Sequence, residues 1–209
     1  MNLLVILVLI AANNVAAFAP LVTRPTKRAT FAQMSATSEE RLEELKELDR
    51  LFSLQVTREL AASQVYLSGS IWCDQNDLVG MSHFMLMESN EEREHALAFV
   101  DFGMKRDITI KLDSVPAPAA DWDTPEDLWS DLLECEKTNT ASLMHLASVA
   151  QKVGDFAVST FLMPFHMEQV DSEAKLKTIL TKVRDENQTP GLLRQLDTEL
   201  ASESAAHGG

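Results

Sequence analysis

Several carboxylates and one histidine interrupt sequence stripes that are otherwise apolar at helical spacing. Glu59 lies seven residues after Phe52 and seven before Tyr66, and Glu92 lies three residues before His95. Residues three apart share one face of a helix, so Glu92 and His95 project toward the same point. An unpaired charge inside a protein is costly, and these carboxylates therefore need a cation or must take up a proton.

The same kind of interruption recurs twice further along the chain. Glu136 lies seven residues before Leu143, and Gln169 lies between Phe165 and Leu176. The stripes carry no matching set of Lys or Arg, so a metal is the simplest partner for the buried charges. A Glu on one helix with Glu-x-x-His on its neighbour is half of the di-metal arrangement built in bundle cores. Carboxylate and imidazole ligands together suit iron.

Each of these positions has an ordinary explanation when it is taken alone. A Glu at an expected core position is usually a surface residue assigned to the wrong face, and a lone His is usually a hydrogen-bonded core residue. Four coincident interruptions, one of them Glu-x-x-His, favour a metal site. His83, His145 and His166 lie off the stripes or are isolated, and Cys135 is expected to be structural.

The spacing of apolar residues predicts four long helices and a short fifth one. Ser38 is expected to cap the first helix, and Pro164 is expected to kink the fourth. Short turns follow the first and third helices, whereas residues 107–122 form a long connection, so the fold class is an all-α bundle with one crossover. The predicted helices cover residues 39–76, 79–105, 124–153 and 192–200, and a fourth helix runs from the break at Gly154-Asp155 to residue 185.

The composition fits one acidic helical domain. The chain has 209 residues, of which 32 are Asp or Glu and 18 are Lys or Arg, and its net charge is -14. Such a charge argues against a nucleic-acid surface and suits a protein that attracts cations, although it could also serve solubility alone. Two cysteines, Cys73 and Cys135, are too few for a disulfide framework.

The first 38 residues have the composition of a targeting sequence. Residues 3–12 form an apolar run of ten, which is short of the about 20 residues that span a membrane and is typical of a signal peptide. Small residues at 15–17 provide a cleavage site, and a basic, hydroxyl-rich stretch without acids follows up to Glu39. With Phe18 at the junction, this pattern resembles the bipartite presequence of diatom plastid proteins and predicts a plastid location. Simple secretion is the competing interpretation.

Four segments of the chain resemble ferritins. Residues 59–68 are similar to the first-helix segment, residues 91–95 (Glu-Glu-Arg-Glu-His) to the second-helix signature, and residues 136–137 and 168–170 to the segments that carry second-metal ligands. The resemblance covers residues 40–200. The expected organisation of the chain is therefore a presequence at 1–38, a ferritin-like di-iron domain at 39–200 and a flexible tail at 201–209.

The resemblance also implies a role for each site residue. Glu59, Glu92 and His95 would take the first iron, and Glu92, Glu136 and Gln169 would surround the second. Tyr66 matches the tyrosine that supplies an electron during oxidation. A third, inward iron site would use Glu88 and Glu91, but its last acid is replaced by Ser172, with Glu173 one residue off. Acids of the threefold pore are replaced by Thr160 and Met163.

The resemblance implies a ferroxidase subunit that oxidises Fe(II) with O2 and stores ferric mineral in a homo-oligomeric cage of 24 subunits. The complete ligand set favours an active subunit. A di-iron oxidase or rubrerythrin-like peroxidase on the same bundle is the alternative, although such proteins normally carry a second Glu-x-x-His. A non-enzymatic helical assembly protein is the second alternative. No nucleic-acid partner and no membrane span are expected in the mature protein.

Overall fold

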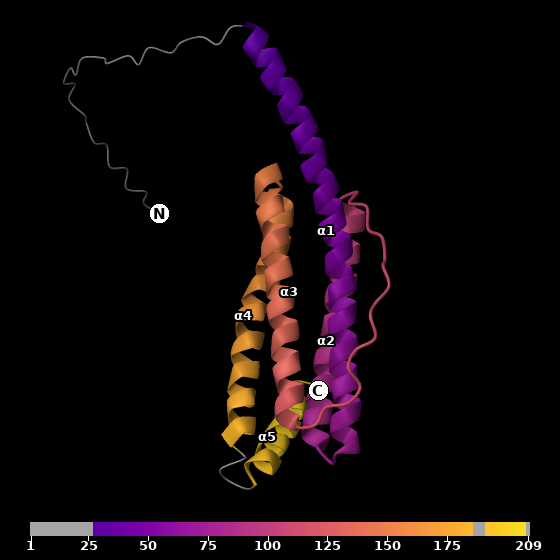
Figure 1. Ribbon diagram of the computed structural model, residues 1–209, viewed down its shortest axis with the longest axis vertical. Coiled ribbons are helices and arrows are strands. Elements are labelled where there is room, and N and C mark those ends of the chain that lie inside the picture. The colour runs from indigo at the N-terminus through magenta and orange to yellow at the C-terminus, as the bar shows by residue number, and fades with distance from the viewer. Residues whose placement is uncertain (1–26, 186–190, 208–209) are drawn as a thin grey trace, which may run out of the picture. The chain divides into compact units, whose positions relative to one another are not determined.

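The computed structural model describes residues 27–185 and 191–207, with side chains for residues 39–185 and 191–203. The signal-peptide prediction for residues 3–17 lies outside the described residues. The chain divides into two units, Met1–Ser38 and Glu39–Gly209, and the bundle belongs to the second. Its helices are α1 (Lys27–Gln75), α2 (Val79–Lys105), α3 (Pro125–Val153), α4 (Phe156–Asp185) and α5 (Leu192–His207) (Figure 1).

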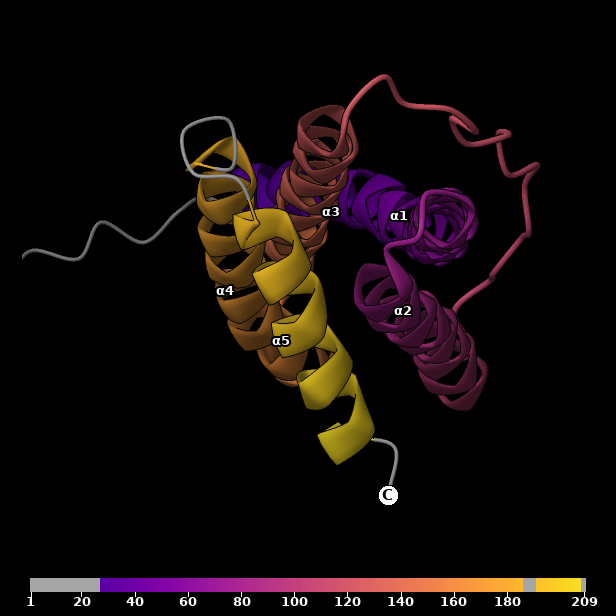
Figure 2. The ribbon, with the colours of Figure 1, turned by 90° about the horizontal axis from the view of Figure 1, so that it is seen from below.

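The four long helices pair as the sequence predicts. α1 and α2 lie side by side, as do α3 and α4, and α5 lies across the end of the bundle (Figures 1 and 2). Residues 106–124 return along the bundle from the end of α2 to the start of α3. This single long crossover confirms the predicted fold class.

The predicted signals at the ends of α3 are confirmed. The hydroxyl of Thr124 accepts a hydrogen bond from the backbone N–H of Asp127, and Pro125 occupies the first helical position. Gly154 ends the helix in the left-handed region, with φ of 71°, which a glycine adopts without steric cost. α4 then continues through Pro164.

Two predicted boundaries and one inward position differ from the structure. α1 begins at Lys27 rather than after Ser38, because residues 27–38 contain no Gly or Pro that would stop a helix. α5 continues beyond Leu200 to His207. Leu45 lies seven residues before Phe52, and this spacing predicts an inward position, but the side chain is 41% exposed and Leu48 is buried in its place. A step of seven drifts around a straight helix, so it loses the inward face toward the end of a stripe.

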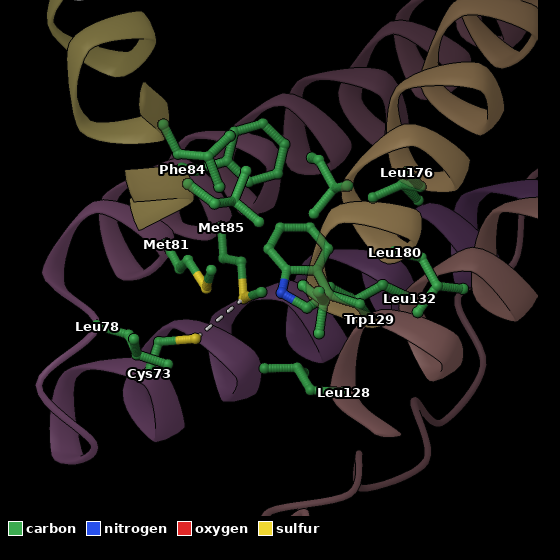
Figure 3. Packing of buried hydrophobic residues seen from close by; sticks show 14 of the residues in the cluster. Cys73, Leu78, Met81, Phe84, Met85, Leu128, Trp129, Leu132, Leu176 and Leu180 are labelled. Carbon is green, nitrogen blue, oxygen red and sulfur yellow. Dashed lines mark hydrogen bonds between the residues drawn. The ribbon is translucent and has the colours of Figure 1, made fainter. Parts of the chain in front are cut away.

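The apolar core of the bundle forms two clusters with a polar layer between them. One cluster lies near α5 and includes Trp129, Phe84 and Met85, which pack together in Figure 3. The other gathers around the rings of Phe52 and Phe99. The layer between them contains buried polar side chains that include Gln55, Glu59, Glu92, Glu136, Asn139 and Gln169. None of the described helices is both long and apolar enough to cross a membrane.

Candidate metal centre

Glu59 of α1 meets Glu92 and His95 of α2 inside the bundle. Each residue offers one ligand atom, and these atoms lie within 4.8 Å of one another. Glu59 is 1% exposed, and Glu92 is also buried. The Oε2 atom of Glu92 is buried without a hydrogen-bond partner and lies 3.7 Å from His95 Nδ1. A cation would satisfy this orphaned oxygen.

The acids of this cluster resist ionisation in the absence of a metal. Burial raises the pKa of Glu59 to about 8, and the neighbouring charge of Glu92 adds to the shift. Burial also raises the pKa of Glu92 and of Glu136. Burial lowers the pKa of His95, but the neighbouring carboxylates of Glu168 and Glu92 outweigh this and raise the pKa to about 11. A divalent cation would relieve the repulsion among the carboxylates.

Glu136 of α3 and Gln169 of α4 complete the polar layer on the other pair of helices. The hydroxyl of Tyr66 donates to Glu136 Oε1, and the Gln169 amide donates to Glu136 Oε2 over 3.0 Å. Burial, followed by the charge of Glu136, raises the pKa of Tyr66 well above its usual range. Both oxygens of Glu136 are therefore oriented before any metal arrives.

A third group of acids opens to a cavity of about 390 Å³ between α2 and α4. His95 Nε2 lies 3.1 Å from Glu168 Oε1, and ligand atoms of Glu91, His95 and Glu168 lie within 4.8 Å of one another. Burial raises the pKa of Glu88 to about 7, although Lys175 lies 4.0 Å away and opposes the shift. This cavity offers carboxylates to a cation arriving from the α2/α4 side.

Glu173 is turned away from this third group. It accepts a hydrogen bond from Thr140 over 2.9 Å and pairs with Lys177 at 2.7 Å. The side chain of Ser172 lines the acidic cavity instead. The shift of one residue noted in the sequence therefore places Glu173 toward α3 rather than among the acids.

The sequence of the bundle matches a known protein family. Residues 51–185 match the model of the ferritin-like domain. The chain belongs to the ferritin family. It is 30% identical to a bacterial non-heme ferritin of Bacteroides fragilis over 66% of this chain and 87% of that protein. It is 29% identical to ferritin BfrB of Mycolicibacterium smegmatis over 74% of this chain and 83% of that one.

Solved structures resemble this ferritin more closely. A crystal structure of apo-ferritin from Pseudo-nitzschia multiseries is 59% identical, with a TM-score of 0.71, over 73% of this chain and 98% of that one. A crystal structure of a ferritin variant soaked in iron is also 59% identical, with a TM-score of 0.70 and the same coverage. The family and the fold of the bundle are thereby established.

The structure places the predicted residues in the polar layer and beside the α2/α4 cavity, and their binding of iron stays a prediction. Sequence reasoning missed two amides of this ferritin that hold Glu59 in place. Gln55 Nε2 donates to Glu59 Oε1 over 2.7 Å, and Asn139 Nδ2 donates to Glu59 Oε2 over 2.8 Å. Each lies one helical turn from a predicted ligand, Gln55 from Glu59 and Asn139 from Glu136. A polar residue one helical turn from a predicted ligand shares its inward face, and this spacing could have identified both amides from the sequence.

Glu168 is a further residue to which the sequence assigned no role. It lies beside Gln169 in a motif that the resemblance noted, and only the packing of α4 against α2 turns it toward His95. A cavity of about 560 Å³ between α1 and residues 109–113 contains none of the predicted ligands. The predicted ligands instead line the polar layer and the acidic α2/α4 cavity.

Proposed function

We infer that this ferritin oxidises Fe(II) with O2 at a di-iron site in its polar layer and stores the ferric product as mineral. The observation that carries this conclusion is the buried, unpartnered oxygen of Glu92 between Glu59 and His95. A buried acceptor without a donor is costly, and a metal ion removes that cost. Membership of the ferritin family supports the same function.

The residues divide the work around two ferrous ions, which are the substrate. Glu59 and His95 hold one ion, Glu136 and Gln169 hold the other, and Glu92 lies between them. Each Fe(II) gives one electron, so one O2 takes two electrons together and, with two protons, becomes hydrogen peroxide. Ionised carboxylates lower the cost of the ferric charge that develops. The apolar clusters on both sides of the layer limit the access of water.

The amides behind the ligands keep the site oriented. Gln55 and Asn139 fix both oxygens of Glu59, and Tyr66 fixes one oxygen of Glu136. Gln169 is a neutral ligand and therefore a weak one, so an ion held by it can leave toward the storage cavity. A di-iron oxidase or peroxidase without mineral storage is disfavoured, because Glu136 and Gln169 stand where such proteins carry their second Glu-x-x-His.

The combined Glu92→Ala and His95→Ala substitutions test this function. We expect the initial rate of aerobic Fe(II) oxidation to fall by more than the roughly 10- to 100-fold that loss of a residue behind the ligands costs. The exposed Glu94→Ala, on the same helix, is the control and should keep the rate. Oxidation at an unchanged rate in the double variant would remove the site from the reaction. Soluble ferric product without a mineral-filled particle would favour the oxidase.

The oligomer is proposed to be a homomeric cage of 24 subunits. Family membership supports it, and so do large apolar side chains on the outer faces of the described helices, such as Leu67, Ile71 and Leu86. Such side chains on a single chain indicate contact surfaces.

The mature protein is proposed to reside in the plastid. The support is the order of signal-like and transit-like segments in residues 1–38. Fusion of residues 1–38 to a fluorescent protein in a diatom should bring fluorescence into the plastid. Secretion of the fusion would contradict this location.

A further inference from the structure

A cavity of about 350 Å³ lies between α1 and α3, on the side of the bundle away from the acidic cavity. Its lining includes exposed, half-buried and buried residues. Ala61, Val65 and Trp122 form half-buried walls. Ala62 and Asn139 form the floor, and they are 2% and 4% exposed.

The floor of this α1/α3 cavity touches the iron site. Asn139 donates from Nδ2 to Glu59 Oε2 over 2.8 Å, so the residue that closes the cavity also holds a ligand. Ala62 lies three residues after Glu59, and both are buried in the bundle. A molecule at the floor is therefore separated from the ligands by one small side chain and one amide.

The lining of the α1/α3 cavity suits a neutral, apolar molecule. Its buried and half-buried lining offers methyl and aromatic surface, the Cys135 thiol and the Asn139 amide, and no carboxylate. The carboxylates at the rim are engaged elsewhere, since Asp131 accepts from Trp122 over 2.8 Å and Glu134 lies 3.4 Å from Lys137. Arg58 adds a positive charge to the half-buried wall, which repels Fe(II).

The two cavities beside the iron site thus differ in chemistry. The α2/α4 cavity carries carboxylates that can pass a cation along, namely Glu88, Glu91, Glu168 and Asp171. The floor of the α1/α3 cavity offers a methyl group and an uncharged amide, and no carboxylate. The reaction has two substrates of opposite character, a hydrated cation and the apolar molecule O2.

We propose that the α1/α3 cavity is the route by which O2 reaches the iron site, with Asn139 as its inner gate. This inference rests on the proposed oxidation of Fe(II) by O2. Separate routes let Fe(II) fill the site without blocking the approach of the oxidant. Asn139 is then a positioning residue that controls the access of O2 and also orients Glu59.

Narrowing the cavity wall tests the route. Ala61→Leu adds bulk to the half-buried wall, whereas Ala141→Leu is the matched control. Ala141 lines a neighbouring cavity that shares Arg58 but does not include Ala62 or Asn139. Initial rates of the assembled protein are measured over a range of O2 concentrations after anaerobic Fe(II) loading. We expect Ala61→Leu to raise the KM for O2 several-fold, with an unchanged rate at saturating O2 and unchanged anaerobic Fe(II) binding.

A crystal pressurised with xenon provides a readout that does not depend on activity. Xenon should occupy the floor beside Ala62 in the wild type and be displaced in Ala61→Leu. Equal O2 dependence in Ala61→Leu and Ala141→Leu, or a rate loss that saturating O2 does not restore, would overturn the route. If the wild type did not oxidise Fe(II), the proposed function itself would be overturned. A negative result in the KM comparison would overturn only the O2 route.

Discussion

Ionisation of the buried Glu59 costs free energy in the metal-free protein, whereas the ionised carboxylate can bind a metal ion when one is present. Its carboxylate is buried beside that of Glu92, and its pKa is raised from the ordinary 4.5 to about 8. Gln55 and Asn139 donate to it, which favours the ionised form but does not outweigh burial. The side chain is held in a geometry that a cation can use without rearrangement.

The raised pKa of Glu59 predicts how the metal-free protein responds to pH. A folded-state pKa above the unfolded value means that the native state binds the extra proton, so this contribution to stability is present below pH 4.5 and is lost as pH rises toward about 8. His95, with its pKa raised to about 11, acts in the same direction at higher pH. We therefore expect Glu59→Gln to lose less stability than the wild type between about pH 5 and pH 8.

Thermal unfolding in the presence of a chelator, followed by circular dichroism, measures this difference. The Tm of the wild type relative to Glu59→Gln should fall as the pH rises, whereas the exposed Glu94→Gln should track the wild type. A parallel pH dependence of Glu59→Gln and the wild type would show that Glu59 does not titrate in this range.

At the scale of the elements, α5 is fastened to the start of α2. Asp197 Oδ1 accepts from the backbone N–H of Met81 over 2.8 Å and so satisfies a donor that α2 leaves free at its first turn. An added Cβ on Gly80 would lie 1.8 Å from the carbonyl oxygen of Asp197. Only a glycine permits this approach of the two helices.

Substitutions at Gly80 and Gly69 distinguish a clash with the backbone from a clash with a flexible side chain. Gly80→Ala forces α5 away from α2 and should destabilise the protein by about 1–3 kcal/mol, as overpacking usually does. Gly69→Ala would meet the sulfur of Met85 at 2.8 Å, and that flexible side chain can move. We expect Gly69→Ala to cost clearly less, as measured by denaturant unfolding. Equal losses would mean that the α2/α5 contact is not tight in solution.

At the scale of the whole molecule, the exposed apolar side chains of α1 and α2 predict assembly. Leu67, Ile71 and Leu86 are each more than two-fifths exposed on the separate chain. Ile71→Glu should shift the protein from the proposed cage to smaller species in native mass spectrometry, because a charge buried at an interface is costly. Gln64→Glu, an exposed position on the same helix, should keep the cage. A wild-type chain that stays monomeric would contradict the cage itself.

Local periodicity determined much of this protein from the sequence alone. Apolar spacing within single helices predicted the limits of α2 and α3. The same spacing predicted the inward positions of Glu59, Glu92 and Glu136. Such spacing depends only on residues that are near one another in the sequence. Family motifs then made iron the expected metal. Leu45 marks the limit of such reasoning, because a step of seven drifts off the inward face of a straight helix.

The tertiary structure decided how the helices face one another. Gln55 and Asn139 meet at Glu59 only because α1 and α3 pack in one relative rotation, and Glu168 reaches His95 only because α4 packs against α2. The α1/α3 cavity and its closed floor arise from the same packing. Spacing along one helix fixes the face that a residue occupies, whereas contacts between helices depend on side chains far apart in the sequence.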